Sequence, residues 1–241
     1  MKLAILSDIH ANDEAFTQVL ADIDRSEVTR VFCLGDVIGY GPEPNQSISL
    51  IRGRNIPAII GNHELAVLEP QYLEWFNPDA RVSLEKTTTL LSDESKRYIR
   101  ELEPSIVAFN CRFVHGFPPD SSLTYLTFVT ESELRHTFVD MKENICFLGH
   151  THTLEIVSYN ENSVERSPLN RGITDLNVDN QYIINVGSVG QPRDGNNTAK
   201  YVIWDTVNHT VEVRFVPYDI QKVADKILEI GLPEVHARRL W

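Results

Sequence analysis

The sequence has few cysteines, and their spacing excludes two common kinds of site. Three cysteines occur among 241 residues, Cys33, Cys111 and Cys146, each in or beside an apolar run. No pair has the short spacing of a thiolate metal site, and an odd number of cysteines argues against a disulfide framework. We therefore expect three reduced cysteines that pack in the core.

The sequence also lacks an excess of positive charge, a long hydrophobic run and a linker. Its formal net charge is −12, with the acidic residues spread along the chain, which argues against a basic groove for nucleic acid. An anionic substrate is compatible with this charge if a bound metal neutralises it locally. No basic leader, bilayer-spanning stretch or linker rich in proline, serine or glycine occurs. The sequence predicts one soluble, cytoplasmic domain over residues 1–241 without a membrane partner, and leaves its oligomeric state open.

Apolar runs and helical patterns alternate in the first part of the chain. Runs at 3–6, 31–34 and 56–60 predict buried strands. Between them lie a helix capped by Asn12 or Asp13 and a second helix that begins near residue 45. This order is typical of parallel strands with helices over both faces. Residues from about 64 to 104 have a polar, helical pattern and predict a helical insertion over one edge of the sheet.

Strand patterns return in the second half of the chain. Strands are expected at 106–109, 112–115, 145–148, 156–159, 182–186, 201–205 and 211–216. The strands after residue 153 alternate in the antiparallel manner, and a last helix is expected to start at Asp219. This order favours an α/β fold in which two sheets pack face to face with helices outside.

Polar side chains follow the apolar runs where each strand is expected to end. Asp8 and His10 follow the first run, Asp36 follows the second, and Asn62 and His63 follow the third. The later strands are followed by three further histidines: His115, His150 and His152. In an open α/β sheet such carboxyl ends lie along one edge, which is where ligands bind.

These residue types indicate a metal centre with nitrogen and oxygen ligands. Imidazole, carboxylate and amide groups without thiolate suit Mn, Fe, Zn or Ni ions. In Asp8-x-His10 and His150-x-His152, two donors lie on the same side of an extended segment. The candidate donors are too many for one ion and suit two divalent metal ions that share a carboxylate: Asp8, His10, Asp36, Asn62, His115, His150 and His152.

The motifs resemble those of the calcineurin-like metallophosphoesterases, in the same order. They read DIH at 8–10, GD at 35–36, GNH at 61–63, HG at 115–116 and GHTH at 149–152. The later segment NVGSVGQPRDG resembles the region that closes the site in the small bacterial and archaeal members. The resemblance implies a four-layer α/β/β/α sandwich of two mixed β-sheets flanked by helices. It also implies that Asp8, His10 and His152 bind one ion, that Asn62, His115 and His150 bind the second, and that Asp36 bridges them.

The sequence departs from the family pattern at two points. Glu64 stands where the family usually has aspartate after Gly-Asn-His, and its carboxylate is expected to orient His63. The Gly-Asp motif continues as VIGYG, so it lacks the phosphate-binding arginine of the Asp-Arg-Gly motif in eukaryotic-type phosphoprotein phosphatases. This absence lowers the case for a protein substrate.

The implied reaction is hydrolysis of a phosphodiester or a small nucleotide. Metal-activated hydroxide would attack phosphorus, and His63, tuned by Glu64, would protonate the leaving group as the general acid. Two alternatives stay open: a phosphomonoesterase or protein phosphatase, and a non-catalytic metal-binding scaffold with the same fold. His63 favours catalysis, because a scaffold has little use for an acid beside a full ligand set.

Some residues near the motifs are ambiguous. Arg193 in QPRD is a candidate to bind substrate together with Asn62, although a solvated arginine or a loop salt bridge explains it as well. Asn12 and Tyr40 could touch substrate, but helix capping and packing account for them equally. The segment ARRLW at 237–241 is basic and apolar, yet too short to indicate a membrane or partner site.

Overall fold

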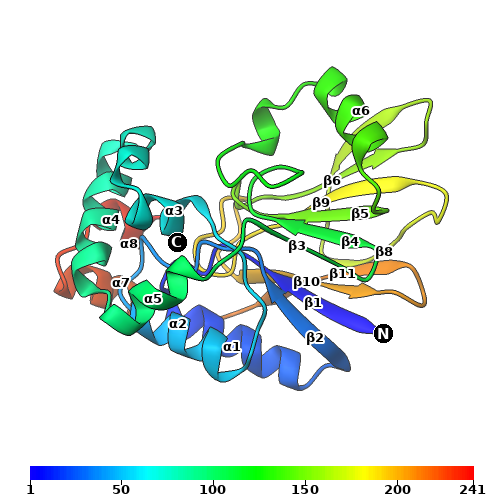
Figure 1. Cartoon of the computed structure of the whole chain (residues 1–241). Coiled ribbons are helices and arrows are strands. Elements are labelled where there is room, and N and C mark those ends of the chain that lie inside the picture. Colours follow the sequence, from blue (N-terminus) through cyan, green and yellow to red (C-terminus); the bar gives the residue numbers. More distant parts are fainter.

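Two β-sheets packed face to face form the centre of the protein (Figure 1). The computed structural model describes residues 1–241. The five-stranded sheet contains, in spatial order, β2 (Val28–Cys33), β1 (Lys2–Leu6), β10 (Ala199–Asp205), β11 (Thr210–Val216) and β8 (Gly172–Asp175). The six-stranded sheet contains β3 (Ser105–Ala108), β4 (Cys111–Val114), β5 (Ile145–Leu148), β9 (Gln181–Val186), β6 (Leu154–Tyr159) and β7 (Val164–Pro168).

Both sheets are mixed, as expected. In the five-stranded sheet β1 runs parallel to β2 and antiparallel to β10. In the six-stranded sheet β5 runs parallel to β4 and β9, whereas β6 is antiparallel to β9. The carboxyl ends of β1, β2, β4 and β5 therefore point toward the same end of the sandwich, where the polar motifs begin.

Eight α-helices and two short 3₁₀ helices surround the sheets. They are α1 (Asp13–Asp24), α2 (Pro44–Gly53), α3 (Asn62–Leu68), η1 (Pro70–Trp75), α4 (Pro78–Leu90), α5 (Asp93–Arg100), η2 (Leu126–Phe128), α6 (Glu131–Asp140), α7 (Ile220–Glu229) and α8 (Glu234–Arg238). In Figure 1, α1 and α2 lie beneath one sheet, α6 lies above the other, and α3, α4, α5, α7 and α8 gather at one end. None of the helices has the length and apolar character needed to cross a membrane.

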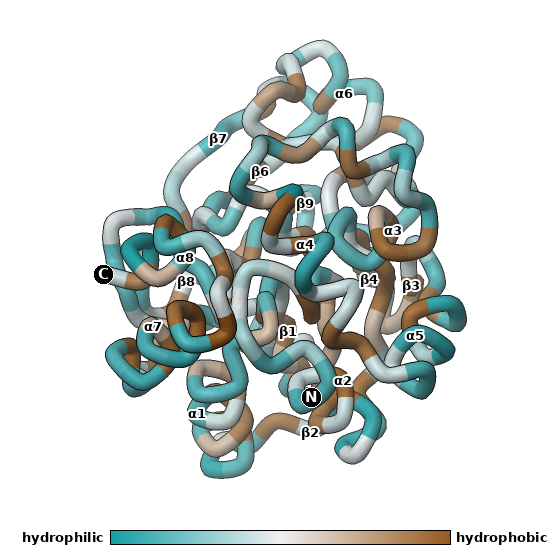
Figure 2. The backbone as a smooth tube through the Cα atoms, turned by 90° about the vertical axis from the view of Figure 1, so that its left-hand side faces the viewer, coloured by the Kyte–Doolittle hydropathy of each residue, from teal (hydrophilic) through white to brown (hydrophobic).

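Three hydrophobic clusters separate the four layers. Along β1, side chains alternate between the two faces of the sheet: Leu3 and Ile5 join the cluster between the sheets, whereas Ala4 and Leu6 join the cluster under α1. A third cluster joins α6, through Phe138, to the outer face of the six-stranded sheet. The four-layer α/β/β/α sandwich is thus held by three apolar interfaces. Figure 2 shows hydrophilic residues at the outer turns of the helices.

The three cysteines are free and buried, as expected. Cys111 lies in the cluster between the sheets and Cys146 in the cluster under α6. Burial raises the pKa of the Cys111 thiol to about 12, so this thiol stays protonated at neutral pH.

The strand expected at 56–60 does not form. Only single bridges join Cys33 to Ala58 and Ile59 to Glu103. Pro57 interrupts the segment, since it has no N–H for a ladder, and its carbonyl accepts a single bond from the N–H of Cys33. The GNHE stretch therefore starts a helix, because α3 begins at Asn62 with Gly61 as its N-cap.

The remaining differences concern elements with weak sequence patterns. The pattern left out α6, β7 and β8, and the helix expected to be the last, α7 with Asp219 as N-cap, is followed by α8. One of these had a usable signal, since Thr130 and Glu133 form a capping box at the start of α6. Helices α3, η1, α4 and α5 fill most of the predicted helical insertion at 64–104.

Candidate metal centre

The loops at the carboxyl ends of four strands bring the polar motifs together. Asp8 and His10 follow β1, Asp36 follows β2, His115 follows β4, and the GHTH motif follows β5. The backbone there is unusual, because a left-handed conformation (φ from 50° to 67°) occurs at five of the predicted ligands: Asp8, His10, Asp36, His150 and His152. Such conformations cost free energy in residues other than glycine and gather at functional sites. The strands thus end in sharp turns that aim these side chains inward.

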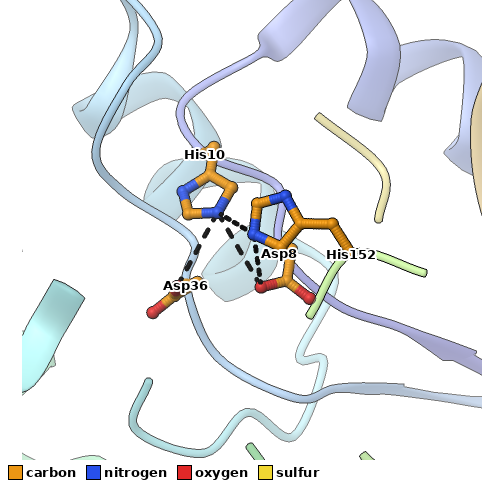
Figure 3. Close-up of side chains that lie close together, drawn as sticks. All are labelled: Asp8, His10, Asp36 and His152. Atoms are coloured by element: carbon orange, nitrogen blue, oxygen red, sulfur yellow. Dashed lines mark hydrogen bonds and ion pairs between the residues drawn. The ribbon is translucent and has the colours of Figure 1, made fainter. Parts of the chain in front are cut away.

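The first cluster joins Asp8, His10, Asp36 and His152 (Figure 3). The Nε2 atom of His10 lies 3.1 Å from Nε2 of His152. Asp8 Oδ1 lies 3.3 Å from Nε2 of His152 and 3.8 Å from Nε2 of His10. Asp36 completes the cluster with its Oδ2 atom 3.7 Å from Nε2 of His10. All four donor atoms are within 4.8 Å of one another and buried.

The second cluster shares Asp36 with the first. Nε2 of His115 lies 3.4 Å from Asp36 Oδ2, 3.1 Å from Nδ1 of His150 and 3.0 Å from Oδ1 of Asn62. Asp36, His115 and His150 form a second group of potential metal ligands. The seven predicted donors thus fall into two groups that meet at one carboxylate, which is the division that the resemblance implied.

Hydrogen bonds of the other ring nitrogens fix where the imidazole lone pairs point. Nδ1 of His10 lies 3.0 Å from the Ile38 carbonyl, and Nδ1 of His152 lies 2.5 Å from the Gln191 carbonyl. A carbonyl only accepts, so each Nδ1 carries the proton and each Nε2 presents a lone pair. Two lone pairs therefore face each other beside Asp8 Oδ1, which has no hydrogen-bond donor. Such a set of acceptors fits a metal cation between them.

The same logic applies to the second cluster. Nδ1 of His115 lies 2.7 Å from the Leu34 carbonyl, and Nε2 of His150 lies 3.3 Å from the Leu123 carbonyl. Burial opposes a positive charge on His115, but the charge and hydrogen bond of Asp36 raise its pKa to about 9. An ion that binds at this Nε2 has to displace a proton, which makes metal affinity dependent on pH. The residues of both clusters fit metal ions of the nitrogen- and oxygen-binding type.

His63 lies beside both clusters without belonging to either. Its Nε2 atom is 3.8 Å from Asp36 Oδ2, and its backbone N–H donates to Asp36 Oδ1 at 3.0 Å. No carbonyl holds its Nδ1 atom, which is buried without a partner. Burial lowers the pKa of His63 to about 4, so its imidazole is neutral at neutral pH unless an anion binds next to it. The side chain is thus placed at the centre and is not engaged as a ligand.

Glu64 does not orient His63, contrary to the expectation from the sequence. Its carboxylate accepts backbone N–H groups from Asp36 at 2.8 Å, Gly61 at 2.9 Å and Ile38 at 3.1 Å. Burial, together with the charge of Asp36, raises the pKa of Glu64 to about 7. The longer side chain reaches the backbone of the Gly-Asp loop and ties that loop to the start of α3. Glu64 therefore positions Asp36 and has no direct contact with the proposed acid.

Arg193 lies at the open side of the centre. Its backbone N–H donates to the carbonyl of His152 at 3.1 Å. Its guanidinium lies over the ring of Tyr40, 5.9 Å from the centroid, and forms no ion pair with a carboxylate. The loop salt bridge considered from the sequence is absent, so the charge is available to an anion.

Asn12 and Tyr40 are explained by structure. The Asn12 side chain accepts the N–H of Ala15 at 3.0 Å as the N-cap of α1 and donates to the Gly190 carbonyl at 2.9 Å. The Tyr40 ring packs 4.5 Å from both the His10 and the His63 rings. Both residues therefore hold the walls of the site in place.

A family model gives an independent result. The model of the calcineurin-like phosphoesterase superfamily domain matches residues 1–209. The chain belongs to this superfamily. The match spans all five motifs and both clusters, so the superfamily assignment and the metal-ligand chemistry come from the same part of the chain.

Two solved structures and one further protein resemble this chain over nearly its whole length. The crystal structure of a metallophosphoesterase from Sphaerobacter thermophilus superposes with a TM-score of 0.85 and 34% identity, covering 100% of this chain and 98% of that one. The hypothetical protein PH1004 from Pyrococcus horikoshii OT3 superposes with a TM-score of 0.82 at 19% identity, covering 100% and 97%, and so shares the fold. The uncharacterized protein MJ0912 of Methanocaldococcus jannaschii is 35% identical, covering 99% of this chain and 97% of that protein.

A cavity of about 500 Å³ opens onto the second cluster of this phosphoesterase-superfamily site. Asn62, His150 and Arg193 lie in its lining. Most of its other walls carry no motif in the sequence; they include Trp75, Phe76, Tyr125, Arg239 and Trp241. The segment ARRLW is basic and apolar, which suits a ligand, but only the fold shows that it lines the cavity at the metal centre.

Proposed function

We propose that this chain is a dinuclear metal-dependent phosphodiesterase that hydrolyses a small phosphodiester or nucleotide. The observation that carries the proposal is the pair of acceptor clusters that meet at Asp36 and open into the cavity beside Arg193. A cavity of about 500 Å³ is within the range of small-ligand pockets. It suits a compact phosphate ester better than a folded protein substrate.

The two clusters are proposed to hold two divalent ions, with Mn, Fe, Zn and Ni as the candidates. Asp8, His10 and His152 bind one ion, whereas Asn62, His115 and His150 bind the other, and Asp36 is shared. Ions held by these residues would supply Lewis acidity toward phosphoryl oxygens and would lower the pKa of the attacking water. The carbonyls behind the imidazoles fix the tautomer whose free lone pair faces the ion and hold each ring in place.

His63 supplies the proton in this proposal. Its imidazole lies beside Asp36 and has a free Nδ1, so no competing hydrogen bond fixes its protonation state. The negative charge of a bound phosphate ester raises the pKa of a neighbouring imidazole. His63 can then donate a proton to the leaving oxygen, a contribution of about 10²–10⁴-fold to the rate.

Arg193 is the proposed phosphate ligand of the chain. Tyr40 occupies the loop where VIGYG replaces Asp-Arg-Gly, and the Arg193 guanidinium lies over the Tyr40 ring. An arginine from the loop after β9 thus brings positive charge to the site from a different part of the sequence. A fixed guanidinium suits bidentate recognition of phosphoryl oxygens.

The test compares hydrolysis of bis-p-nitrophenyl phosphate with that of p-nitrophenyl phosphate. Protein stripped with chelator and reloaded with Mn²⁺ is expected to turn over the diester faster, while the stripped protein and an Asp36→Asn variant lose activity. Preference for the monoester would replace the proposal with a phosphomonoesterase. Two bound ions without turnover of any ester would indicate a metal-binding scaffold.

A further inference from the structure

One wall of the cavity has no role in the proposed chemistry. Trp75 ends η1, and Arg239 and Trp241 follow α8, yet all three line the same cavity as Asn62. Figure 1 shows the C-terminus at the same end of the molecule as α3, the helix that starts at Asn62. Segments from distant parts of the sequence thus form a wall directly beside the metal centre.

The charge of the cavity differs from that of the whole protein. Among the side chains that line it are two guanidinium groups, Arg193 and Arg239, and no carboxylate. Neither arginine forms an ion pair, whereas the adjacent Arg238 lies 2.7 Å from the carboxylate of Glu234. In a chain with a net charge of −12, two unpaired arginines in one cavity create a local positive potential that attracts anions. One guanidinium suffices for a single phosphate, so the second indicates a further anionic group.

The aromatic side chains of the cavity fall into two groups. Tyr125 stacks on His150 with ring centroids 3.7 Å apart, and Phe76 meets His63 edge-on at 4.9 Å. These rings are engaged with the imidazoles of the centre. Trp75 and Trp241 contact no imidazole and are 70% and 65% exposed. Their free faces offer rigid surfaces on which a planar ring can stack.

We propose that Trp75, Trp241 and Arg239 form a subsite for the base and the second phosphate of a nucleotide substrate. This inference rests on the phosphoesterase function proposed above, because it names the substrate class of the same site. The two indoles stack on the base, and Arg239 binds the phosphate that is not hydrolysed. Arg193, whose backbone is hydrogen-bonded to His152, stays with the reacting phosphoryl group.

Calorimetric titration of the full Mn²⁺-loaded chain tests the subsite with two matched probes. Adenosine 5′-(α,β-methylene)diphosphate and methylenediphosphonate carry the same unhydrolysable bridge and differ in the nucleoside. We expect adenosine 5′-(α,β-methylene)diphosphate to bind at least about tenfold more tightly than methylenediphosphonate, which is the scale of stacking on one or two aromatic rings. Trp75→Ala and Trp241→Ala should each reduce this preference about fivefold to tenfold. Arg239→Gln should weaken binding of adenosine 5′-(α,β-methylene)diphosphate more than binding of AMP, which lacks the second phosphate.

Two variants serve as matched controls. Phe128→Ala removes another aromatic ring that is 81% exposed and lies outside the cavity, and Arg238→Gln removes the same charge from the neighbouring position. Both should leave the two dissociation constants unchanged. Equal affinity of the wild-type chain for the two probes, or equal losses in the control variants, would overturn the subsite.

An assay of bis-p-nitrophenyl phosphate hydrolysis distinguishes a failure of the subsite from a failure of the proposed function. Turnover of that diester without a preference for adenosine 5′-(α,β-methylene)diphosphate would refute the subsite but not the proposed phosphodiesterase activity. Preference for the analogue without turnover of any ester supports a nucleotide-binding subsite and removes the catalytic proposal.

Discussion

His63 differs from the histidines of the two clusters in the hydrogen bonding of one ring nitrogen, the one that does not face the metal centre. In His10, His115 and His152 this nitrogen lies 2.5 to 3.0 Å from a backbone carbonyl, which fixes one tautomer. In His63 it is buried without a partner. A fixed tautomer suits a ligand, whereas a proton donor has to change its protonation state, so the hydrogen bonding supports the two roles proposed for these histidines.

Replacing His63 should lower turnover without removing the metal. We expect His63→Ala to lose about 10²–10⁴-fold in kcat on an alkyl phosphodiester, because the leaving alkoxide needs a proton. The loss should be much smaller on a p-nitrophenyl ester, since p-nitrophenolate leaves as a stable anion. Metal content by plasma emission spectrometry should match the wild type, and the exposed His136→Ala serves as control. Equal losses on both esters would refute the assignment of the acid.

The carboxylate of Asp22 should account for part of the acid sensitivity of the fold. It ties α1 to two strands, because it accepts the Tyr201 hydroxyl at 2.8 Å and two N–H groups of Arg214 at 3.1 Å. Partial burial opposes ionisation, but these hydrogen bonds lower the pKa of Asp22 below its ordinary value. Its contribution is therefore present above the unfolded pKa of about 3.9 and is lost as the pH falls through the folded value.

Asp22→Asn should cost about 1–3 kcal/mol of unfolding free energy at pH 7, the scale of hydrogen bonds to a charged group. The difference from the wild type should start to shrink as the pH falls below the unfolded pKa of about 3.9 and should vanish below the lowered pKa of the folded state, because only there is the folded wild-type carboxylate protonated. Urea melts across this pH range measure it, with the exposed Asp179→Asn as control. A difference that does not vary with pH would show that Asp22 contributes through packing and not through its charge.

At the scale of elements, the loop after β9 is as important to the site as the strands that carry the ligands. The N–H of Gly190 donates to the Asp8 carbonyl at 2.9 Å, and its own carbonyl accepts from Asn12. A Cβ atom at Gly190 would lie 1.8 Å from the Ile9 carbonyl. The two loops therefore touch through their backbones, and glycine is required by this close approach.

Two glycine substitutions should have opposite effects on stability. Gly190→Ala should destabilise the fold by at least about 1–3 kcal/mol, because the backbone has to move away from Ile9. Gly53→Ala should stabilise it by about 0.4–1 kcal/mol, since that exposed helical position has open space around the new methyl group. The urea concentrations at the midpoint of unfolding, measured for both variants and the wild type, test these two effects. A neutral Gly190→Ala would mean that the loop after β9 moves freely relative to Ile9.

The element boundaries that were wrong in the sequence analysis share a cause. The segment at 56–60 is apolar like a strand, but Pro57 and the nearby start of α3 leave room only for isolated bridges. Conversely, β7 is largely exposed and has no alternating apolar pattern. Pairing with β6 makes it a strand, and that pairing is set by the sheet and not by its own residues.

At the scale of the whole molecule, metal binding should couple the two sheets. The first cluster joins loops after β1 and β2 of one sheet to the loop after β5 of the other. We expect Mn²⁺ added to chelator-stripped protein to raise the unfolding temperature by about 5–10 °C at a free concentration 100-fold above Kd. Asp36→Asn should remove more than half of this shift, because Asp36 belongs to both clusters.

Differential scanning calorimetry with the metal content measured in parallel tests this coupling. The exposed Asp120→Asn is the control for loss of one negative charge. An Asp36→Asn variant that keeps two ions and the full temperature shift would contradict a shared carboxylate.

The sequence by itself determined the ligand types, their order and the α/β class. Short apolar runs ending in Asp, Asn and His are local patterns. The polar residues at the carboxyl end of a strand lie at the edge of the sheet regardless of which strands pair with it. Asp8, His10 and Asp36 could therefore be assigned to one centre before the fold was known. Only the tertiary structure decided which partner each polar group has. Glu64 bonds backbone amides and not His63, and Trp241 reaches the cavity, because contacts between residues distant in sequence depend on how the layers pack.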